Sequence, residues 1–203
     1  MKLLHLDSSI LGPNSVSRAL SADIVARQEA LHPGLEVVYR DLSTDAALHL
    51  SGAHLAAWQG GKVEGTALGA DLAAGSAYIE ELFAADIIVI GAPMYNFTVP
   101  TQLKAWIDRV VVAGKTFSYG EKGVESLLPK GKKLFIASSR GNVYAAGTPN
   151  TALDHHETYL TSVLAFIGLT DVTVVRAEGI AFGPEARETA ISRAKSEIAA
   201  LAA

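Results

Sequence analysis

The sequence contains no cysteine among its 203 residues. This absence excludes disulfide bonds, cysteine-ligated zinc sites and catalysis by a thiolate. Runs of basic residues are also missing: 17 lysines and arginines stand against 21 aspartates and glutamates, which gives a net charge of −4. A chain with this charge pattern lacks the electrostatic features that bind nucleic acid or an anionic membrane surface.

Long hydrophobic runs are absent as well. No stretch approaches the roughly 18 apolar residues of a membrane-spanning helix, and the N-terminus lacks the charged and apolar regions of a secretory signal peptide. We therefore expect a cytoplasmic protein without membrane or nucleic-acid partners. With 49% hydrophobic and 19% charged residues, the chain is expected to fold as one domain spanning residues 1–203.

Apolar segments rich in β-branched residues alternate with helical patterns along the chain. The predicted strands cover residues 2–7, 35–39, 87–93, 133–137 and 172–177, and the predicted helices cover residues 15–30, 66–83, 103–112, 153–168 and 184–200. This alternation indicates an α/β fold, a three-layer sandwich in which helices cover both faces of one parallel sheet. With five strands, the flavodoxin-like order 2-1-3-4-5 is expected.

Two segments do not fit this alternation. Residues 40–65 are expected to form an inserted, partly helical connection. Residues 114–131, with their glycines and alternating aromatic residues, are expected to form a hairpin.

The predicted strand order makes the first and third strands neighbours at the centre of the sheet. The third strand begins with four consecutive β-branched residues, 87–90, and ends at Pro93, which is typical of a strand buried on both faces. The loops after these two strands, 8–17 and 94–97, are therefore expected at the same carboxyl edge. Open α/β sheets bind their ligands at that edge.

The first of these loops has features of a phosphate site. Ser15-Val16-Ser17 begin a helix, and the free N–H groups at a helix N-terminus favour an anion. The hydroxyl groups of Ser9, Ser15 and Ser17 are suitable neutral donors. Serine is also a common N-cap without any ligand, but the neighbouring 94–97 loop favours the phosphate interpretation. Since neither G-x-G-x-x-G nor a complete P-loop is present, a single-phosphate ligand fits best.

The second loop has features of a flavin site. Met94-Tyr95-Asn96-Phe97 place a thioether, two aromatic rings and an amide beside the sheet edge, and we expect them to hold an isoalloxazine ring with Phe97 on its open face. Simple core packing of Tyr95 and Phe97 is the alternative. Ser139-Arg140-Gly141-Asn142 follow the fourth strand, where donors would stabilise the negative charge of a reduced flavin; an ordinary turn has the same composition.

Other catalytic classes find little support. His156-Glu157 resembles the start of H-E-x-x-H, but Leu160 occupies the last position, so we expect no metal ligands. His155 and His156 are expected to be exposed in the first turn of their helix. No G-x-S-x-G motif marks a serine nucleophile, and no side chain is assigned as a catalytic acid or base.

Taken together, the motifs resemble those of the FMN-dependent NADH azoreductase family, also described as NADH:quinone oxidoreductases, of flavodoxin-like type. The segments that carry the resemblance are Ser8-Ser9-Ile10-Leu11, Ser15-Val16-Ser17, Ala92-Pro93-Met94-Tyr95-Asn96-Phe97, Gln102-Leu103-Lys104, Ala113-Gly114-Lys115-Thr116-Phe117, Ser139-Arg140-Gly141, Phe166-Ile167-Gly168 and Ala177-Glu178-Gly179-Ile180-Ala181. They extend over almost the whole chain in order, and the Ala92–Phe97 block is the most specific.

The resemblance implies a homodimer with FMN sites near the subunit interface. The cofactor-binding residues are then Ser9, Ser15, Val16, Ser17, Pro93, Met94, Tyr95, Asn96, Phe97, Ser139, Arg140, Gly141 and Asn142. Phe97, Tyr119 and Phe166 are implied to line the substrate pocket. Two positions depart from the family pattern: Asn142 stands where many relatives have glycine, and Tyr144 where some have histidine.

The expected function is that of an FMN-dependent NAD(P)H oxidoreductase. It would reduce quinones to hydroquinones and azo compounds to amines by two-electron, ping-pong hydride transfer, in which FMN carries the chemistry. A flavodoxin-like electron carrier without a substrate of its own is the alternative. The sequence leaves NADH and NADPH open as donors. Arg18 and Arg140 are candidates to contact the 2′-phosphate of NADPH, and the sequence gives no geometry for that contact.

Overall fold

The computed structural model describes residues 1–121 and 123–202. Within them, a five-stranded parallel sheet has the order β2-β1-β3-β6-β7. The strands are β1 (Lys2–Asp7), β2 (Glu36–Asp41), β3 (Ile87–Pro93), β6 (Lys133–Arg140) and β7 (Asp171–Glu178). Counted along this sheet alone, the order is 2-1-3-4-5, so the prediction of a flavodoxin-like α/β fold is confirmed.

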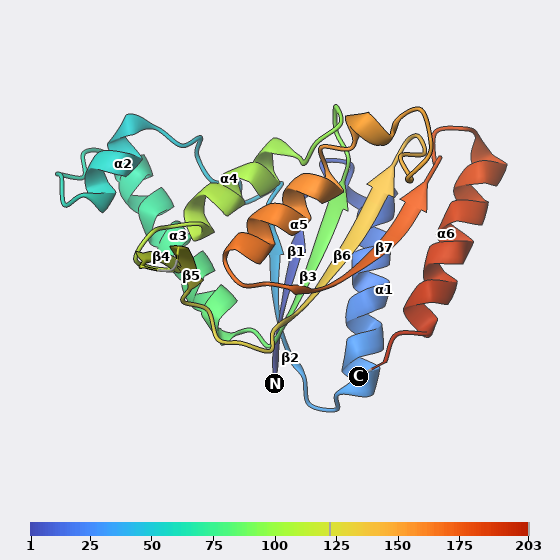
Figure 1. Cartoon of the computed structure of the whole chain (residues 1–203), viewed down its shortest axis with the longest axis horizontal. Helices are drawn as coiled ribbons and strands as arrows, with labels where there is room; N and C mark the ends of the chain where they lie inside the picture. Colours follow the sequence, from blue (N-terminus) through green and yellow to red (C-terminus); the bar gives the residue numbers. More distant parts are fainter. Residues whose placement is uncertain (122, 203) are drawn as a thin grey trace.

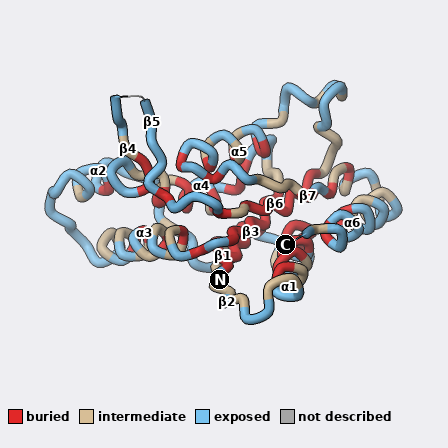
Figure 2. Tube along the Cα trace, turned by 60° about the horizontal axis from the view of Figure 1, so that its bottom comes forward, coloured by how far each residue is buried: buried red, intermediate tan, exposed pale blue. Residues whose placement is uncertain are grey.

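Helices cover both faces of the sheet and form the outer layers (Figure 1). The helices α1 (Val16–Leu31) and α6 (Pro184–Ala199) pack on one face. The other face is covered by α3 (Thr66–Ala84), α4 (Thr101–Val110) and α5 (Glu157–Phe166). Figure 2 shows that buried residues concentrate in the sheet and on the helix faces turned toward it, with exposed residues outside.

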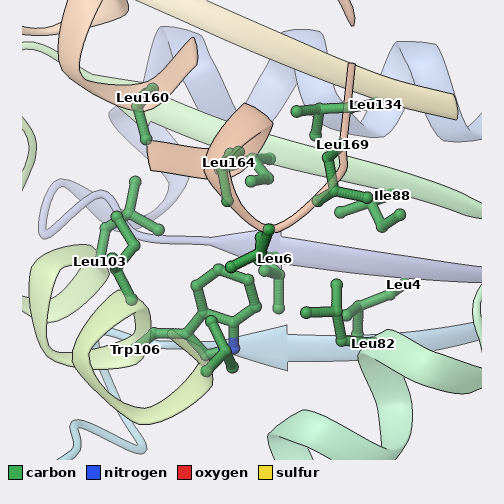
Figure 3. Close-up of a cluster of buried hydrophobic side chains, with 14 of the residues drawn as sticks. Leu4, Leu6, Leu82, Ile88, Leu103, Trp106, Leu134, Leu160, Leu164 and Leu169 are labelled. Atoms are coloured by element: carbon green, nitrogen blue, oxygen red, sulfur yellow. The ribbon is translucent and has the colours of Figure 1, made fainter. Parts of the chain in front are cut away.

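The central strand shows why this layering is stable. All seven residues of β3 are buried, with Ile88 and Ile90 in the core beneath α3, α4 and α5, and Val89 in the core beneath α1 and α6. Figure 3 shows the first of these cores, where Trp106 of α4 lies among leucine side chains from strands and helices. Burial of each such aliphatic side chain contributes roughly 1.5–3 kcal/mol, so helices on both faces are required to cover the strand.

The inserted segment is partly helical, as predicted. It contains α2 (Gly52–Trp58) and is anchored by buried polar groups. Nε2 of His54 lies 3.0 Å from Oδ2 of Asp71, and Nε of Arg109 donates to the same oxygen at 2.7 Å. The anchor therefore joins α2 to α3 and α4, and it explains how a segment with few apolar core residues is held in place.

The predicted hairpin is also present. It consists of β4 (Phe117–Gly120) and β5 (Gly123–Ser126), which pair antiparallel. Residue 122, which the prediction included, lies outside the described residues.

Some predicted boundaries were wrong. The fourth sheet strand, β6, extends beyond residue 137 to Arg140, because its pairing with β7 continues to Glu178. The helix predicted from residue 153 instead begins at Glu157, after a separate 3-10 turn at Thr151–Leu153.

None of the helices in residues 1–121 and 123–202 is both long enough and apolar enough to cross a membrane.

Candidate functional site

The loops after β1 and β3 meet the end of β6 at the carboxyl edge of the sheet. The hydroxyl of Tyr95, after β3, lies 3.1 Å from Oγ of Ser9, after β1, and accepts the N–H of Ile10 at 3.3 Å. On the other side, the N–H of Met94 donates to the carbonyl of Ser139 at 2.8 Å. The structure therefore brings the loops after β1 and β3 together, as the strand order predicted, and places Met94 beside Ser139 at the end of β6, because neighbouring parallel strands end at the same edge.

The N-terminus of α1 forms the first part of this site. Ser15 is its N-cap, and its hydroxyl accepts the N–H of Arg18 at 3.3 Å. The hydroxyls of Ser15 and Ser17 lie 3.1 Å apart, and both residues are buried, as is Ser9. Since the first N–H groups of a helix lack partners within it, the backbone N–H groups of Val16 and Ser17 and these hydroxyls form a donor set suited to a phosphate.

The turn after β3 is strained. Asn96 and Phe97 have φ angles of +48° and +71°, and the turn is closed by paired hydrogen bonds between Tyr95 and Thr98. A left-handed conformation costs a residue such as phenylalanine roughly 1–2 kcal/mol. The carbonyl of Phe97 accepts the N–H of His155 at 3.1 Å, so neighbouring structure maintains the strain. Such strain is common at ligand sites, and here it leaves the Phe97 side chain 45% exposed at the sheet edge.

Arg140, at the end of β6, is buried and surrounded by carboxylates. Its guanidinium donates to Asp154 at 2.7 Å, and it forms ion pairs with Glu178 at 2.7 Å and Glu157 at 3.2 Å. These contacts join β6, β7 and the start of α5. The side chain of Arg140 therefore stabilises the loop that follows it and is unavailable for the 2′-phosphate of NADPH.

The loop after Arg140 is fixed by its own side chains. Oδ1 of Asn142 accepts the N–H of Val143 at 2.7 Å, and its carbonyl accepts the N–H of Gly179 at 3.2 Å. The guanidinium of Arg140 stacks on the Tyr144 ring, with Cζ of Arg140 5.5 Å from the ring centroid. Asn142 and Tyr144 thus have intrachain roles: Asn142 closes the loop and Tyr144 covers Arg140.

His156 was expected to be exposed, and that prediction was wrong. The residue is fully buried at the N-cap of α5, whereas His155 is exposed. Burial, the largest cause, and the nearby Arg140 cation lower the pKa of His156 from 6.5 to about 4, although Asp154 opposes the shift. The error arose because the helix was predicted to begin at residue 153, which placed His156 on an exposed face of its first turn. The helix begins at Glu157, and His156 is its buried N-cap.

Tyr119 and Phe166 do not join the three loops within one chain. Both pack on Phe117, with ring centroids 5.4 and 4.8 Å apart. Figure 1 shows the β4–β5 hairpin away from the upper loops in which the sheet strands end. The two aromatic side chains are nevertheless exposed, at 75% for Tyr119 and 39% for Phe166.

Sequence reasoning missed a polar network beside the first loop. Arg18 donates to the carbonyl of Ser9 and to Asp41, and Tyr39 donates to Asp7 at 3.2 Å. The sequence shows an acidic residue, Asp41, close to the end of a predicted strand, but it does not show that Asp41 pairs with Arg18, because the two residues are 23 positions apart. The Arg18 guanidinium is consequently also engaged within the chain.

A separate cavity of about 670 Å3 lies between β7, α6 and the loop after β6, with Arg176, Phe182 and Arg193 among its lining residues. Its lining includes none of the proposed cofactor or substrate residues.

Comparisons with known proteins agree with this architecture. A family described as having the flavodoxin-like fold matches residues 1–202. The chain is 55% identical over 203 residues to an FMN-dependent NADH:quinone oxidoreductase of Bradyrhizobium sp. strain BTAi1, with 100% of both chains covered. A protein of the same description from Methylorubrum extorquens strain PA1 is also 55% identical over 203 residues, with the same coverage.

Solved structures resemble the chain over nearly their full length. An azoreductase from Bacillus anthracis strain Sterne has a TM-score of 0.85 at 27% identity, with 98% of this chain and 97% of that one covered. An FMN-dependent NADH-azoreductase from Bacillus anthracis strain Ames Ancestor, solved in complex with FMN, has a TM-score of 0.86 at 23% identity, with both chains fully covered. The second likeness supports the fold alone.

Proposed function

Because this chain belongs to the family of FMN-dependent NADH:quinone oxidoreductases, we propose that it binds FMN at the carboxyl edge of its sheet and reduces small acceptors with NADH. The acceptors are quinones, reduced to hydroquinones, and azo compounds, reduced to amines. A quinone consumes one NADH and one proton, and an azo bond consumes two of each. The observation that carries this proposal is that the loop after β3 contacts Ser9 through Tyr95 and Ser139 of β6 through Met94, beside the N-terminus of α1.

The donor set fits the phosphate of FMN. The hydroxyls of Ser15 and Ser17 and the N–H groups of Val16 and Ser17 lie at the N-terminus of α1. Ser9, whose carbonyl accepts from Arg18 of that helix, is proposed to add a third hydroxyl. A phosphate there gains hydrogen bonds and a favourable interaction with the helix dipole. These residues are therefore proposed to set the preference for FMN over riboflavin, which lacks the phosphate.

Residues of the other two loops would hold the isoalloxazine ring. Pro93–Phe97 and Ser139–Asn142 are proposed to contact it, and the exposed Phe97 ring would line the face at which substrates stack. When bound, FMN supplies two-electron hydride chemistry. The chain positions the reactants and excludes water, and no side chain is assigned as an acid or base. Because donor and acceptor would use one opening in turn, we propose ping-pong kinetics.

The substrate pocket is proposed to be completed by a second copy of the chain. Tyr119 and Phe166 are exposed, and both pack on Phe117 of the β4–β5 hairpin. In a homodimer, these aromatic residues of one subunit can line the opening over the other subunit's cofactor. Analytical ultracentrifugation of the wild type and of Tyr119→Ala tests the oligomeric state.

We also propose that the enzyme acts in the cytoplasm.

The function is tested directly by absorbance. The purified protein reconstituted with FMN should be yellow, should lose its 450 nm band on addition of NADH under argon, and should recover it on addition of benzoquinone. Parallel double-reciprocal plots at several quinone concentrations would support the ping-pong order. A protein that takes up no FMN, or whose bound FMN is not reduced by NADH, would contradict the proposal, and the second result would favour an electron carrier.

A further inference from the structure

We propose that Arg18 is a positioning residue for the phosphate site, in which the forked shape of its guanidinium, and not its charge, fixes the loop between β1 and α1. This inference rests on the proposed binding of FMN. It assigns to Arg18 an indirect role: it acts through the backbone of Ser9 without binding the phosphate.

Arg18 contacts the backbone of Ser9 through two of its nitrogens. Nε and Nη2 of Arg18 donate to the carbonyl of Ser9 at 3.1 and 2.7 Å. The hydroxyl of the same serine accepts the N–H of Leu11 at 3.3 Å and meets the hydroxyl of Tyr95 at 3.1 Å. By holding the Ser9 carbonyl, Arg18 therefore fixes a residue whose side chain connects the first loop to the loop after β3.

The same guanidinium also contacts β2 and the residues after it. Nη2, which carries two hydrogens, shares them among the Ser9 carbonyl, Oδ1 of Asp41 at 2.6 Å and Oγ of Ser43 at 2.9 Å, and Nη1 donates to the hydroxyl of Tyr39 at 3.1 Å. The side chain is only 15% exposed. One planar group thus joins the start of α1, the end of β1 and the end of β2, and its orientation is fixed from several sides.

The charge of Arg18 is already balanced within the chain. Asp7 and Asp41 are paired neighbours in the register of β1 and β2, and Arg18 lies 3.8 Å from Oδ2 of Asp7 as well as 2.6 Å from Asp41. Two carboxylates at adjacent strand ends repel each other without a cation between them. The guanidinium therefore neutralises these carboxylates and does not bind the phosphate. The hydroxyls and N–H groups at the N-terminus of α1 are proposed to bind the phosphate instead.

Shape and charge make different predictions for a lysine at this position. A lysine keeps the charge, but its single nitrogen cannot reproduce the planar fork that meets a carbonyl and a carboxylate together. A positioning role predicts that Arg18→Lys loosens the Ser9 loop and weakens FMN binding. A purely electrostatic role predicts that Arg18→Lys retains FMN.

The experiment measures dissociation constants of FMN and riboflavin by flavin fluorescence quenching for the apo forms of the wild type, Arg18→Lys and Arg27→Lys. Arg27 is a matched control on the same helix, because its Nε and Nη2 donate to the carbonyl of Leu201 at 3.0 and 2.7 Å. We expect Arg18→Lys to bind FMN at least about tenfold more weakly, the factor for one lost charged hydrogen bond. Riboflavin binding should weaken by a smaller factor than FMN binding, because riboflavin lacks the phosphate that the first loop is proposed to hold, and Arg27→Lys should match the wild type.

A second variant keeps the test decisive if Arg18→Lys does not fold. Asp41→Asn retains Arg18 but removes the charge that orients it. Positioning predicts weaker FMN binding, whereas simple electrostatics predicts tighter binding because a negative charge near the anion is removed. The proposal is overturned if Arg18→Lys binds FMN like the wild type, if FMN and riboflavin weaken equally, or if Asp41→Asn tightens FMN binding. A wild type that binds neither flavin would instead contradict the proposed function.

Discussion

The buried His156 makes a quantitative prediction about acid stability. Its pKa in the folded chain is about 4, against 6.5 for an ordinary histidine, because burial disfavours the charged ring. As the pH falls below 6.5, the unfolded chain binds a proton that the folded chain resists, so the free energy of unfolding decreases until the pH reaches about 4. Between pH 7 and pH 5 this linkage amounts to about 2 kcal/mol.

The assay is urea unfolding followed by circular dichroism at pH 7 and pH 5. His156→Gln keeps a polar side chain that does not titrate in this range, so its free energy of unfolding should fall by about 2 kcal/mol less than that of the wild type. His155→Gln is the matched control, because His155 is exposed next to it, and it should follow the wild type. The comparison uses the change with pH, so a cost of the substitution common to both conditions cancels. Equal pH dependence in His156→Gln and the wild type would refute the reasoning.

Three further predictions follow from single contacts. Lys132 donates to the carbonyls of Phe83 and Ala85 at the end of α3, so Lys132→Met should lower the free energy of unfolding by about 1–3 kcal/mol, measured by urea titration; an unchanged midpoint would contradict this capping role. Ser17→Ala should weaken FMN retention by about five- to tenfold in equilibrium dialysis, with riboflavin as the control ligand. Phe97→Ala should change the ratio of kcat/KM for quinone and azo acceptors and leave FMN affinity within about threefold; an unaltered ratio would place Phe97 outside the substrate opening.

Much of the fold could be predicted because its signals are local. The unbroken apolar run of β3 indicated a strand covered on both faces, and all its residues are buried. Alternating strand and helix patterns then left few ways to arrange a parallel sheet, since connections between parallel strands are right-handed. The predicted end of β6 and the predicted start of α5 were wrong, because strand pairing and helix capping, and not local composition, set these two boundaries. Strand β6 continues beyond residue 137 because β7 pairs with it as far as Glu178.

The candidate site divides in the same way. Residues at the ends of neighbouring strands could be grouped from the strand order alone, and the structure shows Tyr95 in contact with Ser9 and Met94 in contact with Ser139. The burial of His156 and the engagement of Arg140 by three carboxylates could not, because they depend on how α5 and β7 pack against the end of β6.

The sequence by itself determined the parallel sheet, the order of its strands and the edge at which the loops gather, because the periodicity of apolar residues and the positions of strand ends are properties of the chain. Only the tertiary structure decided which charges meet. Arg18 and Asp41 are 23 positions apart and become partners because β1 and β2 are adjacent. Hydrogen bonds act over about 3 Å, so the role of such a side chain depends on the neighbours that folding supplies.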